Sequence, residues 1–480
     1  MNKTLKQHQN VFKKSYYSRL TCIRMVLQSH GVVELREDVP LKPYNASPGF
    51  CSGGPRLIIG AFSALTIAIT IALFTQIYYG DYQIVPHGSV SSSAAECSSI
   101  GTNILRDGGG AIDAAIASSL CLAVVAPHRT SLDASGSLLF WEYRKSPTEQ
   151  PTLIEWGGIQ NASSPSISPA PRLIVALAAL HKTYGVIPWS KLLQPAIDLA
   201  STGYNISTGL SIAAASQVEP GYITGSTRKE PLLASYLQLL QHNTSTELCT
   251  TWPCEALAPI TSAAVPAGPW RVWTGTAGAR AATALAAALV PAPLTALDGF
   301  QRVVSSLQAQ AITAAGNWPS GVASGLAVVD PQDTYVALVT GLSVPFGSGN
   351  ITGDGWKQDL PSSPLDLAPA ILIDEFVCGT RYVMGAESLS ALAEGAAAAL
   401  IEGPLNIVDA VESARVAVGA GGTLALEPDR LLPPAALATL LNGVPLNATL
   451  PLAALNLVQQ RGDELLSHAD SRGGGLASRF

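Results

Sequence analysis

One uncharged apolar segment near the N-terminus constrains this chain more than any other feature. The run from Leu57 to Tyr79 contains no Asp, Glu, Lys or Arg. About 20 apolar residues are enough to span the hydrocarbon core of a bilayer. A cleavable signal peptide has an apolar core of about 7–15 residues close to the N-terminus, whereas this run begins only after Arg56. We therefore predict a retained transmembrane helix at residues 57–79, in preference to a signal peptide or a buried core helix.

The distribution of basic residues around this segment predicts its orientation. Lys and Arg recur throughout the first 56 residues, and after the segment the next one is Arg106. Basic residues flank the cytoplasmic end of a membrane span. The sequence therefore predicts a type II membrane protein with a cytoplasmic tail at 1–56 and an extracellular or lumenal domain at 80–480.

The composition of the chain excludes several classes of protein. Of its residues, 48% are hydrophobic and 13% are charged, and the net charge is −6. Such a chain can bury a sizeable core and is not disordered. A nucleic-acid partner is not expected, since no basic stripe stands out. The cysteines and histidines lack metal-ligand spacing, so no metal and no other cofactor is expected.

The cysteines and glycosylation sequons fit an oxidising, lumenal compartment. Cys249 and Cys254 flank a short Thr-Thr-Trp-Pro segment and could close a small disulfide loop. We expect Cys97, Cys121 and Cys378 to be buried free thiols, since each lies in an apolar run. Sequons for N-glycosylation occur beyond the predicted span at Asn161, Asn205, Asn243, Asn350 and Asn447.

The hydrophobic pattern of the domain predicts a mixture of helices and strands. Apolar residues recur at helical spacing over 94–105 and 111–125. Residues 325–329 and 335–339 have strand character around a turn, which predicts a hairpin. Further expectations are strands at 137–143 and 152–156, helices at 278–289, 300–315, 389–401 and 407–418, two short helices separated or kinked by Pro195, and loop over 240–270. Together these elements favour an α+β layered domain.

Several of these segments, in this order, resemble the gamma-glutamyltransferase (glutathione hydrolase) family, its membrane-anchored form above all. NILRDGGGAIDAAIASSLCLAVVAPH resembles the opening helix pair of that family, and LAVVDPQDTYVALVTGLSVPFGSG resembles the hairpin that follows its nucleophile. Further similar segments are Ile187–Trp189, Gln194–Ala200, DAVESARV and the closing ADSRGGG at Ala469–Gly475. The resemblance spans roughly Gly88 to the C-terminus.

This resemblance implies a fold and an activity. Members of the family are N-terminal-nucleophile hydrolases with an αββα four-layer sandwich. They cleave and transfer the γ-glutamyl group of glutathione and other γ-glutamyl compounds. Autocleavage exposes a threonine whose own amine activates its hydroxyl. Backbone amides stabilise the oxyanion, and an arginine pairs with the substrate carboxylate.

The chain departs from the family at each of these catalytic positions. Ala323 stands where the resemblance places the threonine, and the adjacent Ser324 is the one candidate nucleophile. Gly157 and Gly158 replace the substrate-binding arginine, for which Arg129 is a candidate substitute.

The remaining positions of the family site differ as well. Ser388 and Leu389 stand at the oxyanion-type glycine pair, and Glu387 and Asp366 are the nearest carboxylates. Glu387 is therefore a second candidate for substrate binding. The linker that precedes the family's cleavage site is also far shorter here.

Three functional hypotheses follow. The first is a family member that keeps the scaffold, has lost catalysis and acts as a membrane-bound binding or interaction glycoprotein. The second is a working glutathione hydrolase that uses Ser324 or another hydroxyl. The third is an unrelated type II glycoprotein.

Overall fold

The computed structural model describes most of the chain, in two compact units, residues 1–84 and 85–480. Predictions for Cys378, Asn161 and Asn447 fall outside the described residues. The described residues are 54–79, 87–158, 170–262, 264–293, 295–374, 379–402, 406–427 and 453–480.

The described part of the first unit is one long helix, α2 (Gly54–Tyr79). Its 26 residues extend about 39 Å at the α-helical rise. The segment Ile58–Thr75 has a mean hydropathy of 2.2, and none of it is buried within the molecule. By length and composition, α2 can therefore cross a bilayer, as the sequence predicts for residues 57–79.

The second unit contains two large antiparallel sheets. The seven-stranded sheet has the order β17-β1-β9-β10-β2-β3-β6, and the six-stranded sheet has the order β16-β15-β12-β11-β8-β7. The strands of the first sheet are β1 (Ser89–Ser92), β2 (Ser135–Glu142), β3 (Thr152–Trp156), β6 (Ile260–Thr261), β9 (Val322–Val329), β10 (Thr334–Leu342) and β17 (Ser478–Arg479). Those of the second are β7 (Ala264–Ala267), β8 (Trp270–Thr274), β11 (Ala368–Asp374), β12 (Thr380–Ala386), β15 (Leu455–Arg461) and β16 (Glu464–Ala469).

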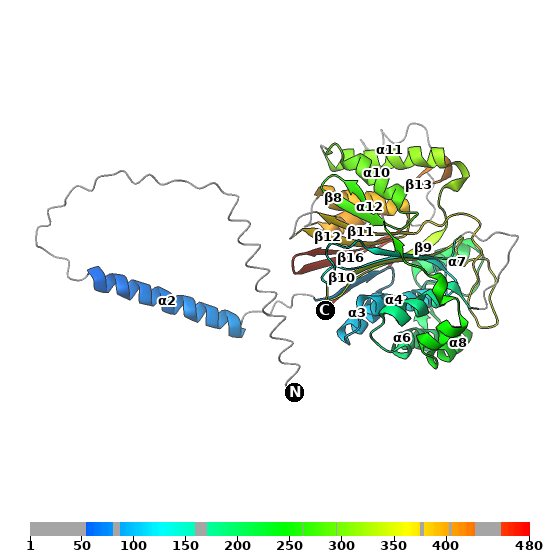
Figure 1. The fold of residues 1–480 in the computed structure, drawn as a ribbon, viewed down its shortest axis with the longest axis horizontal. Helices are drawn as coiled ribbons and strands as arrows, with labels where there is room; N and C mark the ends of the chain where they lie inside the picture. Colours follow the sequence, from blue (N-terminus) through cyan, green and yellow to red (C-terminus); the bar gives the residue numbers. More distant parts are fainter. Residues whose placement is uncertain are drawn as a thin grey trace, which may run out of the picture. The chain divides into compact units, whose positions relative to one another are not determined.

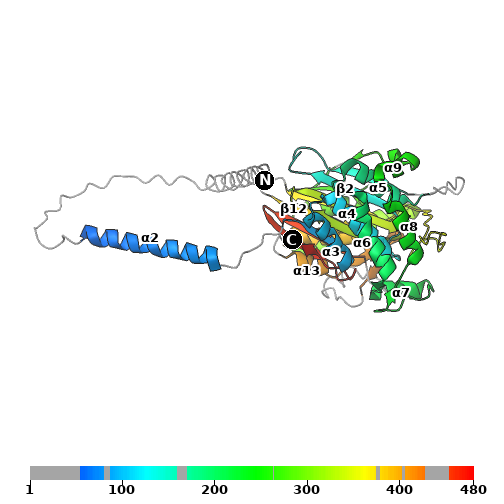
Figure 2. The ribbon, with the colours of Figure 1, turned by 90° about the horizontal axis from the view of Figure 1, so that it is seen from below.

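Helices cover the outer face of each sheet, so the layers run helix, sheet, sheet, helix (Figure 1). The seven-stranded sheet is covered by α3 (Ala95–Arg106), α4 (Ala111–Val125), α5 (Arg172–Tyr184), α6 (Trp189–Thr202), α7 (Thr208–Ser216), α8 (Pro231–Gln241) and α9 (Ser245–Thr251). The six-stranded sheet is covered by α10 (Ala279–Leu289), α11 (Ala296–Ala314), α12 (Leu389–Glu402) and α13 (Ile407–Glu412). Figure 2 shows α3, α4 and α6 across the face of the first sheet.

The two sheets meet in a third, central hydrophobic layer. Alternate residues of β9 divide between the layers, because successive strand side chains point to opposite faces. Ala327 and Val329 pack between the sheets, whereas Leu326 and Val328 pack against the helices. The sheets approach closely at Gly325 and Gly385, where a Cβ on Gly325 would lie 2.2 Å from the Gly385 carbonyl oxygen. Glycine is required at this crossing for steric reasons.

The hairpin β9–β10 forms where the sequence predicts it. Asp333 in its turn has a φ of 57°, a region that Asn and Asp tolerate better than most residues. The Asp330 carboxylate accepts hydrogen bonds from the backbone N–H groups of Gln332, Thr334 and Ala111. Asp330 therefore ties the turn to the first turn of α4.

The structure corrects one prediction about the cysteines. Cys97 on α3 and Cys121 on α4 form a disulfide, with their Cα atoms 5.4 Å apart, and are not free thiols. The Gly-rich turn between these helices folds them against each other, which aligns two residues 24 positions apart. Cys249 and Cys254 form the disulfide that the sequence suggests.

The structure also corrects three secondary-structure predictions. Residues Trp189–Thr202 form one helix that includes Pro195, because its buried face holds the helix together across the missing N–H. The predicted loop at 240–270 contains α9, β6, β7 and β8; α9 begins with a capping box between Thr244 and Glu247. The predicted helix at 407–418 ends at Glu412 and is followed by β13 (Val416–Val418).

Candidate active site

Ala323 lies in β9, at the position where the family resemblance places the catalytic threonine. Its side chain is buried in a small apolar cluster with Val339, Leu365 and Leu367. Its cross-strand partner is Gly341. A methyl group in an apolar cluster offers neither a nucleophile nor a proton donor, so no acyl transfer can begin at this side chain.

Ser324 points to the opposite face of β9 from Ala323. It lies opposite Thr340 in β10, and its exposed fraction is 2%. Its side chain shares the face of Leu326 and Val328, which pack against the helices. Within the described ranges, no side chain or backbone group forms a hydrogen bond with the Ser324 Oγ. The hydroxyl therefore lacks the hydrogen-bonded base that activates a serine nucleophile.

The two candidate substrate-binding residues, Arg129 and Glu387, bind each other. The Arg129 Nη1 lies 2.8 Å from Oε1 and 2.7 Å from Oε2 of Glu387. The Ser93 hydroxyl donates to Oε1 over 2.6 Å, and the Ala454 N–H donates to Oε2 over 2.9 Å. The side chains are only 12% and 3% exposed. Both charges are thus neutralised inside the protein.

The Asp366 carboxyl group binds the backbone N–H of Leu389, the first residue of α12. The resemblance places the oxyanion site in this region. Its Oδ1 accepts a hydrogen bond from the Leu389 N–H over 2.8 Å. A carboxylate is favoured at a helix N-terminus by the unpaired N–H groups and the helix dipole. Burial nevertheless raises the pKa of Asp366 to about 7, and the Leu389 hydrogen bond opposes this shift. The chain's own carboxyl group therefore fills this anion site.

Arg172 is an arginine that the sequence did not single out. It pairs with the Asp133 carboxylate through Nε at 2.9 Å and Nη2 at 3.1 Å. Its Nη1 lies 3.5 Å from the Ser135 hydroxyl, which also accepts the Gly158 N–H. Arg172 thus lies near the glycines that replace the family's arginine, but Asp133 occupies its guanidinium. No motif in the sequence marks this arginine, because the residues that follow it in the helix, 173–180, are all apolar.

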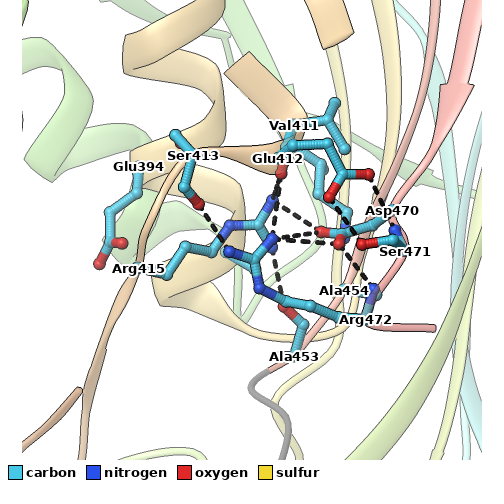
Figure 3. Close-up of polar contacts among 12 residues, drawn as sticks. Glu394, Val411, Glu412, Ser413, Arg415, Ala453, Ala454, Asp470, Ser471 and Arg472 are labelled. Atoms are coloured by element: carbon cyan, nitrogen blue, oxygen red, sulfur yellow. Dashed lines mark hydrogen bonds and ion pairs between the residues drawn. The ribbon is translucent and has the colours of Figure 1, made fainter. Parts of the chain in front are cut away.

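A second polar cluster surrounds the Asp-Ser-Arg of the closing motif (Figure 3). Asp470 forms ion pairs with Arg415 at 2.9 Å and with Arg472 at 3.0 Å. Arg472 also pairs with Glu427 at 2.7 Å. The arginines donate further hydrogen bonds to backbone carbonyl oxygens of the α13 region and of Ala453. The closing motif, which the sequence shows only through its resemblance to the family, therefore anchors this part of the core.

Within the described residues, no group of three or more His, Cys, Asp or Glu side chains could hold a metal ion.

Comparisons with known proteins agree with the resemblance. Residues 97–288 match the gamma-glutamyltranspeptidase family. The chain is 31% identical to glutathione hydrolase 7 of Bos taurus over 235 residues, which covers 43% of this chain and 35% of that protein. It is 37% identical to glutathione hydrolase 6 of Bos taurus over 136 residues, which covers 28% of this chain and 26% of that protein. The matches thus span about a third of these relatives or less.

A structural comparison extends the likeness over most of the chain. The cephalosporin acylase from Bacillus halodurans superimposes with a TM-score of 0.66 and 15% sequence identity. The superposition covers 82% of this chain and 96% of the acylase. At this identity the comparison shows the fold alone, a mixed helix and sheet fold of the N-terminal-nucleophile hydrolase type. Residues 97–288 thus match the gamma-glutamyltranspeptidase family in sequence, and the fold of the larger unit agrees with that likeness.

Proposed function

We propose that this chain is a type II membrane glycoprotein that keeps the family scaffold without cleaving γ-glutamyl bonds, and that it acts as a binding or interaction protein. The observation that carries this proposal is Ala323, which stands at the nucleophile position with its methyl group in an apolar cluster. Neither autocleavage nor acyl transfer can start from alanine.

The surrounding polar groups support the same proposal. In the family, the substrate carboxylate and the oxyanion need free donors. Here Glu387 already holds Arg129, and Asp366 already holds the Leu389 N–H. A γ-glutamyl substrate would have to break a buried ion pair to reach Arg129, which costs several kcal/mol. Binding of glutathione or another γ-glutamyl compound in the family manner is therefore disfavoured.

The topology rests on independent features of the chain. Basic residues precede α2, and the domain that follows contains two disulfides. Disulfides persist in oxidising compartments such as the secretory pathway. Of the five lumenal sequons, Asn205, Asn243 and Asn350 lie in the described ranges, and all three side chains are exposed. An exposed asparagine can carry a glycan without disturbing the core.

The test is a denaturing gel of the full chain made in mammalian cells, blotted for tags at both ends, with and without N-glycosidase. One uncleaved chain whose mass falls on glycosidase treatment is expected. The same protein should release no aniline from a γ-glutamyl anilide above the background of a Ser324→Ala variant.

Other outcomes would overturn the proposal in distinct ways. Two fragments that meet near Ala323 or Ser324, or turnover that disappears in Ser324→Ala, would establish the working hydrolase instead. A chain whose mass is unchanged by glycosidase would refute the lumenal topology. Stepwise loss of glycans in Asn205→Gln, Asn243→Gln and Asn350→Gln would assign the occupied sites.

A further inference from the structure

A cavity of about 230 Å³ lies on the helical side of the seven-stranded sheet, between the end of α4 and the start of α8. Its apolar walls come from Val124, Pro127, Leu132, Leu233 and Trp356. Leu132, Leu233 and Trp356 belong to the core between the helices and the sheet. Ala323 is not among the residues that line the cavity, and Arg129 lies between the lining residues Pro127 and Ser131 in the sequence.

Two ion pairs line this cavity. The Lys357 Nζ lies 3.1 Å from the Glu219 carboxylate and 4.2 Å from the centre of the Phe346 ring. The Lys357 side chain is 10% exposed and that of Glu219 is 24% exposed. The aromatic ring and the surrounding core thus hold the ammonium group in place, while Glu219 has access to water. A competing carboxylate could displace Glu219 without moving Lys357.

The second ion pair is built in the same way. The Arg228 Nε lies 2.5 Å from Glu230, and its guanidinium carbon lies 4.0 Å from the centre of the Tyr222 ring. Both cations of the cavity therefore rest on aromatic faces, which stabilise them independently of their carboxylate partners.

Trp356 and the N-terminus of α8 border the same cavity. The indole Nε1 of Trp356 is covered by neighbouring atoms and has no hydrogen-bond partner among the described residues. The helix reaches the cavity at Pro231, Leu232 and Leu233. Its N-cap, Glu230, makes no side-chain capping bond, so Leu232 and Leu233 carry uncapped N–H groups, whereas Pro231 has none.

The charges that line the cavity balance, since Lys357 and Arg228 face two carboxylates, Glu219 and Glu230. An added anion must therefore take the place of one of these carboxylates. Burial lowers the pKa of Lys357, and the neighbouring Glu219 opposes this shift only in part. The N-terminus of α8 favours a negative ligand at its edge of the cavity.

We propose that this cavity binds a small monocarboxylate with an apolar body, whose carboxylate takes the place of Glu219 at Lys357. The apolar walls would receive a body of about the size of a phenyl ring, since a cavity of about 150 Å³ already accommodates benzene. The carboxylate would then lie between Lys357 and the N-terminus of α8. This assignment does not depend on whether the active site is functional.

The first test compares 3-phenylpropionate with its neutral analogue 3-phenylpropanamide, using the full chain in mild detergent and ligand-observed NMR titration. We expect the acid to bind with a dissociation constant on the order of 1 mM, as suits a ligand of this size. The amide should bind at least about tenfold more weakly, because it lacks the charge-assisted hydrogen bond to Lys357. Equal binding of the two compounds, or binding of neither, would overturn the proposal.

Variants of one ion pair provide the second test. Lys357→Met should weaken binding of 3-phenylpropionate at least about tenfold, whereas Lys145→Met, which removes the ion-paired lysine of the exposed Lys145–Glu142 pair, should leave binding unchanged. Glu219→Gln should strengthen binding, because it removes the internal competitor for Lys357. A loss of binding in Glu219→Gln would contradict the proposal, and so would full binding in Lys357→Met. A gain of affinity cannot result from misfolding. The affinity of Glu219→Gln for 3-phenylpropionate therefore tests the proposal even if Lys357→Met fails to fold.

Discussion

Arg129 and Glu387 lie 258 positions apart in the sequence and meet as a buried ion pair. The family resemblance makes each of them a candidate ligand for a charged substrate. In the structure each is the other's partner, and Ser93 and Ala454 complete the hydrogen bonding of the carboxylate. The role of such residues is thus set by what the fold places beside them.

The first prediction concerns this pair. Arg129→Met should lower the free energy of unfolding by about 3 kcal/mol, because it leaves the Glu387 carboxylate buried without its cation. The double variant Arg129→Met/Glu387→Gln should recover part of that loss, since no buried charge then remains unpaired. Urea denaturation of the four proteins of this cycle measures the coupling. Strictly additive losses would show that the pair is not coupled in the folded chain.

The second prediction concerns Glu394 on α12, which lies near Arg415 and Arg472. Its Oε2 accepts the Val416 N–H, while its Oε1 has no partner within the described ranges. Burial raises the pKa of Glu394 to about 8. Between its ordinary pKa and that value, the folded chain holds a proton that the unfolded chain releases. Stability therefore falls as pH rises through this window, by about 1.4 kcal/mol per pH unit at most.

A Glu394→Gln variant tests this assignment. Glutamine does not titrate, so the variant should gain stability relative to the natural chain as pH rises from about 5 to about 8. Thermal unfolding at several pH values measures the difference. The exposed Glu149→Gln serves as the control and should show no such trend. A constant difference across the pH range would rule out Glu394 as the titrating group.

At the scale of elements, the packing of α3 against α4 explains why two predicted free thiols form a disulfide. Both helices show clear apolar periodicity, and the glycines after Arg106 favour a turn. Periodicity states which face of a helix is buried, but it does not state which residues of two neighbouring helices face each other. The Cys97–Cys121 pairing depends on that register, which is a property of the packed helices.

The third prediction compares the two disulfides. The Cys97–Cys121 bridge joins residues 24 positions apart, and Cys249–Cys254 joins residues 5 apart. In the chain-entropy model, a longer loop restricts the unfolded chain more. Replacing Cys97 and Cys121 by alanine should lower the free energy of unfolding by about 3 kcal/mol, and replacing Cys249 and Cys254 should cost about 1 kcal/mol less than that. Chemical denaturation under non-reducing conditions gives the order, and the reverse order would contradict this account.

At the scale of the whole molecule, the four layers are held in register where the two sheets cross at Gly325 and Gly385. A Cβ on Gly385 would lie 2.3 Å from the backbone nitrogen of Leu326. No side chain can move to relieve this contact, because both partners are backbone atoms of central strands. The sheets themselves would have to separate.

The fourth prediction follows from this crossing. Gly385→Ala should destabilise the chain by roughly 3 kcal/mol, at the upper end of what overpacking costs in a core. Gly209→Ala is the matched control, since a Cβ there meets no atom within 4 Å, and alanine is favoured over glycine in a helix. Thermal unfolding should separate the two variants clearly. A tolerated Gly385→Ala would show that the sheets can shift apart.

The sequence alone determined the apolar span, the helices α3 and α4 and the β9–β10 hairpin. These features depend on local composition and on apolar periods of two or 3.6 residues. Such patterns can be read from a short stretch of sequence. The T-x-x-E capping signal of α9 is equally local, but the Thr/Pro-rich composition around it favours a loop. The local pattern also predicts a helix that continues beyond Glu412, where α13 ends. The strand that follows is stabilised by a hydrogen bond from the Val416 N–H to Glu394, which lies on another helix.

Only the tertiary structure decided which residues meet. It paired Arg129 with Glu387, placed Asp366 at the N-terminus of α12, joined Cys97 to Cys121 and gathered Lys357, Glu219 and Trp356 around one cavity. Each of these contacts joins segments whose separation in space depends on how sheets and helices stack. The free energy of such a contact comes from removing both partners from water together, and a linear sequence contains no record of which groups are buried side by side.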